Sequence, residues 1–363
     1  MKTGYFMTGF PGFISEKLLR KWLNEKDEKH IYLLVLPSMQ QKAAARIEQL
    51  KCEIQTVSTI HIVQGDITKK DIGLSSTVHT YLKDKINYVW HLAAAYDLAI
   101  DQPTAYKVNV KGTYHVNEWV KSLTTLKRYV YFSTAYVAGR RNGLIKENEL
   151  IRPEQFRNYY EETKFEAEVL VDKMKEEYPV TILRPGIVKG DTATGETSKF
   201  DGPYYLLNIF DKTKNFSRIP YISRSSAKLN VVPVEYVIDA ASYLGRYEES
   251  AGKTYHLTDP NPYPAREIYR FLMQKQTGKT PKGFISHKMM DKALAIPKVR
   301  KHLGAEREGL EYFFWDGEFD QAETAGDLKG SGIRCADFLD GLDAMIAFYN
   351  RHKDEKEFHT LIK

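Results

Sequence analysis

The sequence contains very little cysteine. Cys52 and Cys335 are its two cysteines among 363 residues, and they lie far apart in the chain. Two cysteines build no disulfide framework, and no CxxC pair is present to hold zinc. The ten histidines form no HExxH or similar cluster, so no metal site is expected. We therefore expect two free thiols in a reducing compartment, the cytoplasm.

Long apolar runs are missing as well. The longest, such as residues 31–36, fall far short of the roughly eighteen residues that span a bilayer. The fairly apolar start of the chain is interrupted by glycines and Pro11, and no small-x-small cleavage site follows it. Neither a transmembrane segment nor a signal peptide is expected.

The charge of the chain has no strong excess of one sign. Fifty-three basic and 47 acidic residues leave a net charge of +6, and the basic residues look scattered rather than gathered in a stripe. This argues against nucleic acid as a partner. Hydrophobic residues make up 42% and charged residues 28%, as in ordinary globular proteins. The length suggests two domains, or one large domain with a cap.

Apolar strand-like runs alternate with helical patterns through the first half of the chain. This alternation predicts an α/β fold, a Rossmann doubly wound parallel sheet with helices on both faces. The strands are expected at residues 5–8, 31–36, 60–63, 88–92, 128–133 and 180–183, and the helices at 16–24, 40–50, 106–122 and 159–177.

The pattern changes after Pro185. Residues 191–200 are rich in Gly, Thr and Ser, and most of the remaining chain is helical with many aromatics. Residues 230–233 and 254–257 are strand-like, with a helix over 235–247 between them. We predict a dinucleotide-binding domain over 1–190, to which 230–257 return, and a smaller, mostly helical substrate lobe in the rest of 191–363. Such a lobe would close over the carboxyl ends of the strands, where ligands of open α/β sheets bind.

A glycine-rich loop stands between the first strand and the first helix. Its glycines allow a tight turn, and the helix N-terminus after it offers N–H donors to a pyrophosphate. Ser15 takes the place of the third glycine of the full pattern. A plain strand-to-helix turn would use similar residues, so the loop alone leaves both interpretations open. The candidate cofactor-binding residues here are Thr8, Gly9, Phe10, Pro11, Gly12, Phe13 and Ile14.

The end of the second strand bears on the choice between NAD and NADP. NAD sites usually place an acid there to hold the ribose 2′-hydroxyl. No acid appears before Glu48, whereas Ser38, Lys42 and Arg46 are candidates to receive a 2′-phosphate. NADP is therefore favoured over NAD, although Lys42 and Arg46 would also suit a solvated helix face.

Two further motifs suggest acid–base chemistry. Tyr160 and Lys164 are four residues apart, so both lie on one helix face, and a nearby ammonium would lower the pKa of the tyrosine. Thr134, just after the fifth strand, offers a hydroxyl to a substrate carbonyl, although Ser133 and Thr134 would also suit local turn caps. A surface Tyr/Lys pair is the simpler alternative for the first motif.

Together these motifs resemble the extended short-chain dehydrogenase/reductases. The matching segments are the glycine loop, residues 65–67, 91–94, 109–113, 133–134, the Tyr160/Lys164 pair and residues 183–186, with 231–237 resembling the segment that returns to the nucleotide domain. The resemblance implies that Thr134 polarises the substrate oxygen, that Tyr160 is the general acid/base, and that Lys164 binds the nicotinamide ribose. It also implies cofactor contacts from Asp66, Ile67, Ala93, Ala94, Ala95, Asn109, Ser133, Pro185, Gly186, Ile187 and Val188.

Within that superfamily the chain looks most like the male-sterility NAD-binding branch, with fatty acyl-CoA reductases and thioester reductases. Residues 8–13 and 256–260 carry this likeness, whereas Leu36 stands where thioester reductases commonly have Arg. The likeness implies a small substrate, hydrophobic or linked to CoA or a carrier protein, and often a homodimer. Lys189, Arg224 and Lys228 are candidates for phosphate contacts, or ordinary surface charges.

Three functions stay open. The first is an NAD(P)-dependent oxidoreductase that transfers hydride to or from a carbonyl, aldehyde or acyl thioester. The second is a nucleotide-sugar epimerase or dehydratase, which has the same fold and similar catalytic residues; Ala135 and Tyr136 after Thr134 disfavour a dehydratase, which usually has acids there. The third is a non-catalytic protein that senses the cofactor, which the complete Thr134/Tyr160/Lys164 set disfavours.

Overall fold

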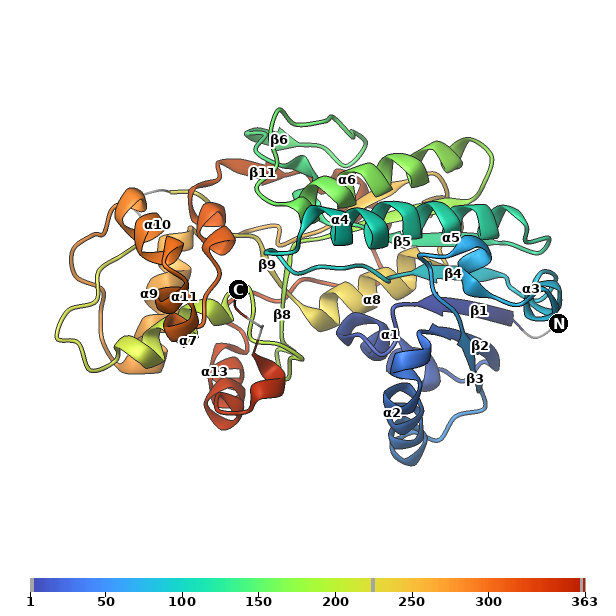
Figure 1. The fold of residues 1–363 in the computed structure, drawn as a ribbon, viewed down its shortest axis with the longest axis horizontal. Coiled ribbons are helices and arrows are strands. Elements are labelled where there is room, and N and C mark those ends of the chain that lie inside the picture. Colours follow the sequence, from blue (N-terminus) through green and yellow to red (C-terminus); the bar gives the residue numbers. More distant parts are fainter. Residues whose placement is uncertain (1–2, 223–225, 360–361, 363) are drawn as a thin grey trace.

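A seven-stranded parallel sheet forms the centre of the molecule (Figure 1). The computed structural model describes residues 3–222, 226–359 and 362. The strands lie in the order β10-β7-β5-β4-β1-β2-β3, and every neighbouring pair is parallel. This confirms the predicted Rossmann-like α/β fold. The strand bounds are β1 (Thr3–Thr8), β2 (Lys29–Val35), β3 (Thr59–Gln64), β4 (Tyr88–His91), β5 (Arg128–Phe132), β7 (Val180–Pro185) and β10 (Thr254–Leu257).

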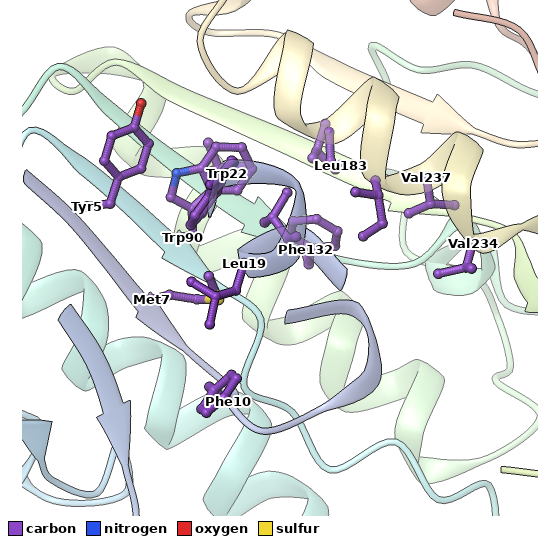
Figure 2. Close-up of a cluster of buried hydrophobic side chains, with 14 of the residues drawn as sticks. Tyr5, Met7, Phe10, Leu19, Trp22, Trp90, Phe132, Leu183, Val234 and Val237 are labelled. Atoms are coloured by element: carbon purple, nitrogen blue, oxygen red, sulfur yellow. The ribbon is translucent and has the colours of Figure 1, made fainter. Parts of the chain in front are cut away.

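Helices cover both faces of this sheet because most of its strands are apolar on both sides. Along β1, Met7 packs into one hydrophobic cluster and Phe6 into another, as the period of two requires. On the Met7 side, Trp22 lies against Trp90 with their ring centroids 5.0 Å apart (Figure 2). On the other side, the ring of Phe6 packs against Trp119.

The helices of the sheet domain largely follow the predicted pattern. They are α1 (Phe13–Leu23), α2 (Gln40–Glu53), α3 (Ser76–Leu82), α4 (Gln102–Ala105), α5 (Gly112–Lys121), α6 (Tyr159–Asp172) and α8 (Val234–Leu244). The single helix predicted over 106–122 begins earlier, at Gln102, and includes a π-helical stretch over Tyr106–Lys111. No helix was predicted at α3.

A second group of helices forms the lobe on the left of Figure 1. It contains α7 (Tyr204–Thr213), α9 (Ala265–Thr277), α10 (His287–Ala295), α11 (Pro297–Leu303) and α13 (Leu342–His352), around a core of its own. Two short parallel strand pairs accompany the two parts of the chain, β8 (Ile187–Lys189) with β9 (Val231–Pro233) and β6 (Gly143–Ile145) with β11 (Gly317–Phe319).

Late segments of the chain return to the sheet. Helix α8 packs on α1, and β10 forms an edge of the sheet beside β7. Helix α12 (Ala322–Asp327) contacts β10, and Leu328 belongs to the same cluster as Trp22. The exact division into two domains stays a prediction. Among the described residues, no helix has both the length and the apolar character needed to cross a membrane.

Candidate active site

One large cavity, of about 780 Å³, lies at the carboxyl ends of the strands and extends into the lobe. One part is lined by the loop between β1 and α1 and by residues that follow β4, β5 and β7. The sheet order reverses between β1 and β4, and ligands of open α/β sheets bind at such a switch point. The cavity is the natural candidate for the functional site.

The glycine loop passes very close to the chain that follows β4. Gly9 has a φ of +92°, and a Cβ there would lie 2.8 Å from the amide nitrogen of Ala93. The Gly12 N–H donates to the Gly9 carbonyl at 2.8 Å, and α1 begins at Phe13. This cradle fits a dinucleotide, because it brings bare backbone and a helix N-terminus to the cavity wall.

Ser15 completes this turn where the usual pattern has glycine. Its hydroxyl lies 2.9 Å from the Gly9 carbonyl and 2.8 Å from the Gly12 carbonyl, and the side chain is buried. The departure from the family pattern therefore leaves the first turn of α1 intact. The hydroxyl adds a hydrogen bond that a glycine cannot make.

The proposed acid–base residues meet at the cavity wall. Asn158 caps the N-terminus of α6 by accepting from the Glu161 N–H, which places Tyr160 in the first turn and Lys164 one turn later. Thr134, at the end of β5, hydrogen-bonds the Tyr160 phenol and also accepts from the Tyr136 N–H at 3.3 Å. Thr134, Tyr160 and Lys164 all line the cavity.

The electrostatics of Tyr160 differ from the sequence-based expectation. Burial raises the pKa of Tyr160, and the hydrogen bond from Thr134 only partly offsets this rise. Lys164 does not lower the pKa, because its ammonium donates instead to the Tyr131 hydroxyl at 2.7 Å and to the Phe132 carbonyl at 2.6 Å. Burial lowers the pKa of Lys164 itself to about 7.

A buried chain of hydrogen bonds connects Lys164 to the glycine loop. Tyr131 bonds to Thr113, whose hydroxyl lies 3.1 Å from Nε2 of His91. Nδ1 of His91 lies 2.7 Å from the Thr8 hydroxyl. Burial lowers the pKa of His91 to about 3, so the ring is neutral. Sequence reasoning assigned no part to Tyr131 and missed this chain, because its members come from three strands and two helices.

A second buried network lies beneath Ser133. The Ser133 hydroxyl donates to Glu168, which also pairs with Arg184 through Nε at 2.8 Å and Nη2 at 2.6 Å. Arg184 in turn lies 3.2 Å from Nε2 of His256 on β10. The network fixes the end of β5 beside Thr134, and sequence reasoning did not identify Glu168.

The predicted cofactor-binding residues divide into two groups. Those that line the cavity are Thr8, Gly9, Phe10, Pro11, Gly12, Phe13, Ile14, Asp66, Ile67, Ala93, Ala94, Ser133, Tyr160, Lys164, Pro185, Gly186, Ile187 and Val188. Those that do not line it are Ser38, Lys42, Arg46, Ala95 and Asn109.

Two residues of the second group have other partners. Arg46 pairs with Glu16 and hydrogen-bonds Gln49. Asn109 exchanges hydrogen bonds with the backbone of Ala95, which positions the loop after β4. At the end of β2 the cavity is lined by Leu36 and Met39 instead of the predicted polar residues.

The part of the cavity inside the lobe is mostly apolar. We call it the apolar arm and define it by Leu98, Tyr136, Ile187, Tyr205, Leu206, Ile209, Ile222, Leu229, Met290, Leu294, Leu310, Tyr312 and Phe313. Tyr312 ties the lobe to α6, because its hydroxyl donates to Glu161 at 2.7 Å.

A cluster of three polar residues, Tyr96, Lys199 and Asp201, lies in the cavity wall near Tyr160. Lys199 hydrogen-bonds Tyr96 and lies 4.8 Å from its ring centroid, and Asp201 lies close enough to both to affect their pKa values. Burial raises the pKa of Asp201 to about 6. Sequence reasoning assigned none of these residues, and Lys199 lies in a stretch, residues 191–200, that has only a loop-like composition.

The candidate phosphate contacts have mixed outcomes. Lys189 is buried and donates to the carbonyls of Phe338 and Asp340, both at 3.0 Å, so it is not open to a ligand. Lys228 pairs with Glu318 on the surface. Arg224 lies outside the described residues.

Comparisons with known proteins indicate the family of the chain. A family model of the NAD-binding type, described as male sterility protein, matches residues 7–241. The chain is 26% identical over 295 residues to the non-canonical nonribosomal peptide synthetase cpsA of Aspergillus campestris, covering 76% of this chain and 28% of that protein. It is 26% identical over 272 residues to the fatty acyl-CoA reductase wat of Drosophila melanogaster, covering 65% and 53%. The chain thus spans about half or less of these curated relatives.

Solved structures show the same fold. The terminal R domain of a myxalamid PKS-NRPS pathway matches with a TM-score of 0.78 and 24% identity, covering 99% of this chain and 93% of that one. A UDP-glucuronic acid 4-epimerase from Bacillus cereus, in complex with NAD, matches with a TM-score of 0.66 and 16% identity, covering 97% and 98%. The family match covers well over half of the chain and includes the glycine loop, Thr134, Tyr160 and Lys164. The chain therefore belongs to the NAD-binding family described as male sterility protein.

Proposed function

We propose that the chain is an NAD(P)-dependent reductase of an acyl thioester or an aldehyde with an apolar acyl group. One observation carries the proposal: Thr134, Tyr160 and Lys164 line a single cavity that has the glycine loop at one end and the apolar arm at the other. Among the relatives, the fatty acyl-CoA reductase and an L-2-aminoadipate reductase of Saccharomyces cerevisiae support a reductase. A synthetase relative supports a carrier-linked substrate.

The residues around the glycine loop are suited to hold the cofactor. The turn at Gly9 and the N-terminus of α1 would take the pyrophosphate, and Asp66 and Ile67 would contact the adenine end. Pro185 and Gly186 would face the nicotinamide. When bound, the nicotinamide supplies or accepts a hydride.

The chain's own residues would handle the substrate oxygen. Thr134 and Tyr160, already hydrogen-bonded to each other, would both donate to the carbonyl oxygen. As the carbonyl carbon gains a hydride, Tyr160 gives its proton to that oxygen. With a thioester, the product of this step is a hemithioacetal. Its hydroxyl proton passes to the sulfur as the carbon–sulfur bond breaks, which releases a thiol and an aldehyde.

Lys164 would have to turn from Tyr131 and Phe132 toward the cofactor ribose to take part. Once turned toward the ribose, its ammonium would stabilise the phenolate of Tyr160 and offset the rise that burial causes in the pKa of Tyr160.

We also propose a preference for NADP. Its support is the absence of an acid between the end of β2 and Glu48, together with Arg46 on the first turns of α2. For Arg46 to bind a 2′-phosphate it must leave Glu16. Titration of the purified chain with NADPH and NADH tests the preference, and equal affinity would contradict it.

A Tyr160→Phe variant tests the reaction. It should lose at least about 100-fold in turnover while keeping its affinity for NADPH, because it loses only the transferable proton. Tyr159→Phe is the matched control, since Tyr159 is 44% exposed and does not line the cavity. Turnover of acyl thioesters and aldehydes is followed by NADPH absorbance. Undiminished turnover in Tyr160→Phe would refute the assigned mechanism.

A cofactor-recycling epimerase is the second candidate, and likeness to the epimerase shows only the shared fold. Mass spectrometry of the nucleotide released on denaturation separates the two candidates. Tightly retained NAD would favour the epimerase, whereas an empty chain that prefers NADPH would favour the reductase.

A further inference from the structure

Helices α10 and α11 form an outer wall of the lobe. The inward side of α10 contributes Met290 and Leu294 to the apolar arm. Its outward side exposes Lys288, Met289 and Lys292, and Lys292 lies four residues after Lys288 and three after Met289, one turn further along the same side. A single helix therefore separates the cavity from the solvent here. Figure 1 shows α10 and α11 in the lobe, far from the β1–β3 side of the sheet.

The outward side combines exposed apolar side chains with positive charge. Met289 is 62% exposed and Ile296 is 52% exposed. Lys298 and Lys301 continue the positive charge along the exposed side of α11. We call Lys288, Met289, Lys292, Ile296, Lys298 and Lys301 the α10–α11 surface.

No acidic side chain neutralises this surface from its own helices. The one acid in α10 and α11 is Asp291, and Arg307 binds it with two hydrogen bonds. Within residues 3–222, 226–359 and 362, none of the four lysines makes an ion pair.

We propose that the α10–α11 surface docks on a bilayer that contains anionic phospholipid. Lysines around exposed aliphatic side chains are typical of helices that lie in the membrane interface, where the lysines meet lipid phosphates and the apolar groups enter the acyl boundary. An acidic protein is a poorer fit, because protein interfaces are depleted in Lys and enriched in Arg and aromatic residues. None of the six residues of the surface is aromatic or Arg.

Docking in this orientation places the wall of the apolar arm against the lipid. An apolar substrate dissolved in the bilayer would then lie one helix away from Met290 and Leu294, with little water to cross. This consequence rests on the proposed function, but the docking does not.

Vesicle sedimentation tests the docking without any activity measurement. The whole chain is mixed with vesicles of phosphatidylcholine alone, or with 30% phosphatidylglycerol, at low and high salt. We expect cosedimentation with the anionic vesicles that high salt suppresses. Replacing Lys288, Lys292, Lys298 and Lys301 with Gln should weaken it at least ~100-fold, since each lysine near such a surface contributes about fivefold.

Two further variants make the result specific. Lys26, Lys83, Lys127 and Lys173 are also exposed, and replacing all four with Gln should leave vesicle binding within about threefold, although the net charge falls equally. Met289→Ser with Ile296→Ser should weaken binding and retain its salt dependence. Thermal melting shows that each variant is folded.

Several outcomes would overturn the proposal. A chain that fails to sediment with anionic vesicles has no such docking surface, even if it were to bind an acidic protein. Equal losses in the two lysine variants would show that net charge alone causes the binding. Unchanged binding after the Met289 and Ile296 replacements would contradict the proposed insertion of apolar side chains into the bilayer.

Discussion

Lys164 is an ionisable side chain in an almost fully enclosed position. Its side chain is 2% exposed, and burial lowers its pKa to about 7 in the folded chain, against about 10.5 when unfolded. Between these two values the unfolded chain binds a proton that the folded chain has lost. The free energy of unfolding therefore gains a contribution from Lys164 that rises with pH, by about 1.4 kcal/mol per pH unit.

Replacing Lys164 with Met removes this buried charge. We expect Lys164→Met to abolish turnover. Its free energy of unfolding should exceed that of the wild type by the largest amount at or below pH 7. The difference should shrink as the pH rises toward 10. Urea unfolding at several pH values measures it, with exposed Lys173→Met as the control, whose difference should stay constant. A pH-independent difference for Lys164→Met would contradict the burial argument.

At the scale of single residues, the sequence predicted the site residues that are close together in the chain or that directly follow a strand. Tyr160 and Lys164 lie one helical turn apart, and Thr134 follows a strand end, so their meeting at one cavity could be predicted. The partners of Lys164 could not be predicted, because Tyr131 and Phe132 are distant from it in sequence and look like ordinary core residues. The direction of the pKa shift of Tyr160 was missed for the same reason, since burial depends on the tertiary structure.

Among the elements, the first turn of α1 offers a sharp test of the Ser15 hydroxyl. Ser15→Ala removes the hydrogen bonding to Gly9 and Gly12 and should lower the free energy of unfolding by about 1 kcal/mol. Ser15→Gly should cost up to about 1 kcal/mol more, because glycine adds backbone freedom inside a helix. Chemical denaturation followed by circular dichroism measures both. A Ser15→Gly variant as stable as the wild type would refute the bonding role.

The elements of the sheet domain were more predictable than those of the lobe. The sheet strands are continuous apolar runs bounded by turn residues, and β10 matched residues 254–257. The lobe contains short helices whose apolar residues face a core assembled from distant segments, such as α7 and α9. Short elements carry too few periods to be located by pattern. The pair β6 and β11 was missed because each strand has only three residues.

At the scale of the whole molecule, the cavity couples its two parts. The glycine loop, the strand ends and the lobe all line this cavity. A cofactor that fills the part beside the glycine loop should therefore stabilise the fold by mass action. At a concentration of one hundred times Kd, NADPH should raise the free energy of unfolding by about 2.7 kcal/mol. Differential scanning calorimetry measures the increase in Tm, and the Tyr160→Phe variant should show the same increase. An unchanged Tm would refute cofactor binding at this site. The predicted homodimer and cytoplasmic location remain predictions.

The course of the chain through the cavity has one more consequence. Every residue proposed for the proton transfer lies at or before Lys164, whereas most of the apolar arm comes from Ile187 onward. On the proposed function, the residues for the reaction and most of the residues that would contact the acyl group thus lie in successive stretches of the sequence. Substitutions in the second stretch would then change the preferred substrate and leave the reaction unchanged. A graft of the lobe from a relative would therefore have to keep residues 1–186 together with α8 and β10, which return to the sheet.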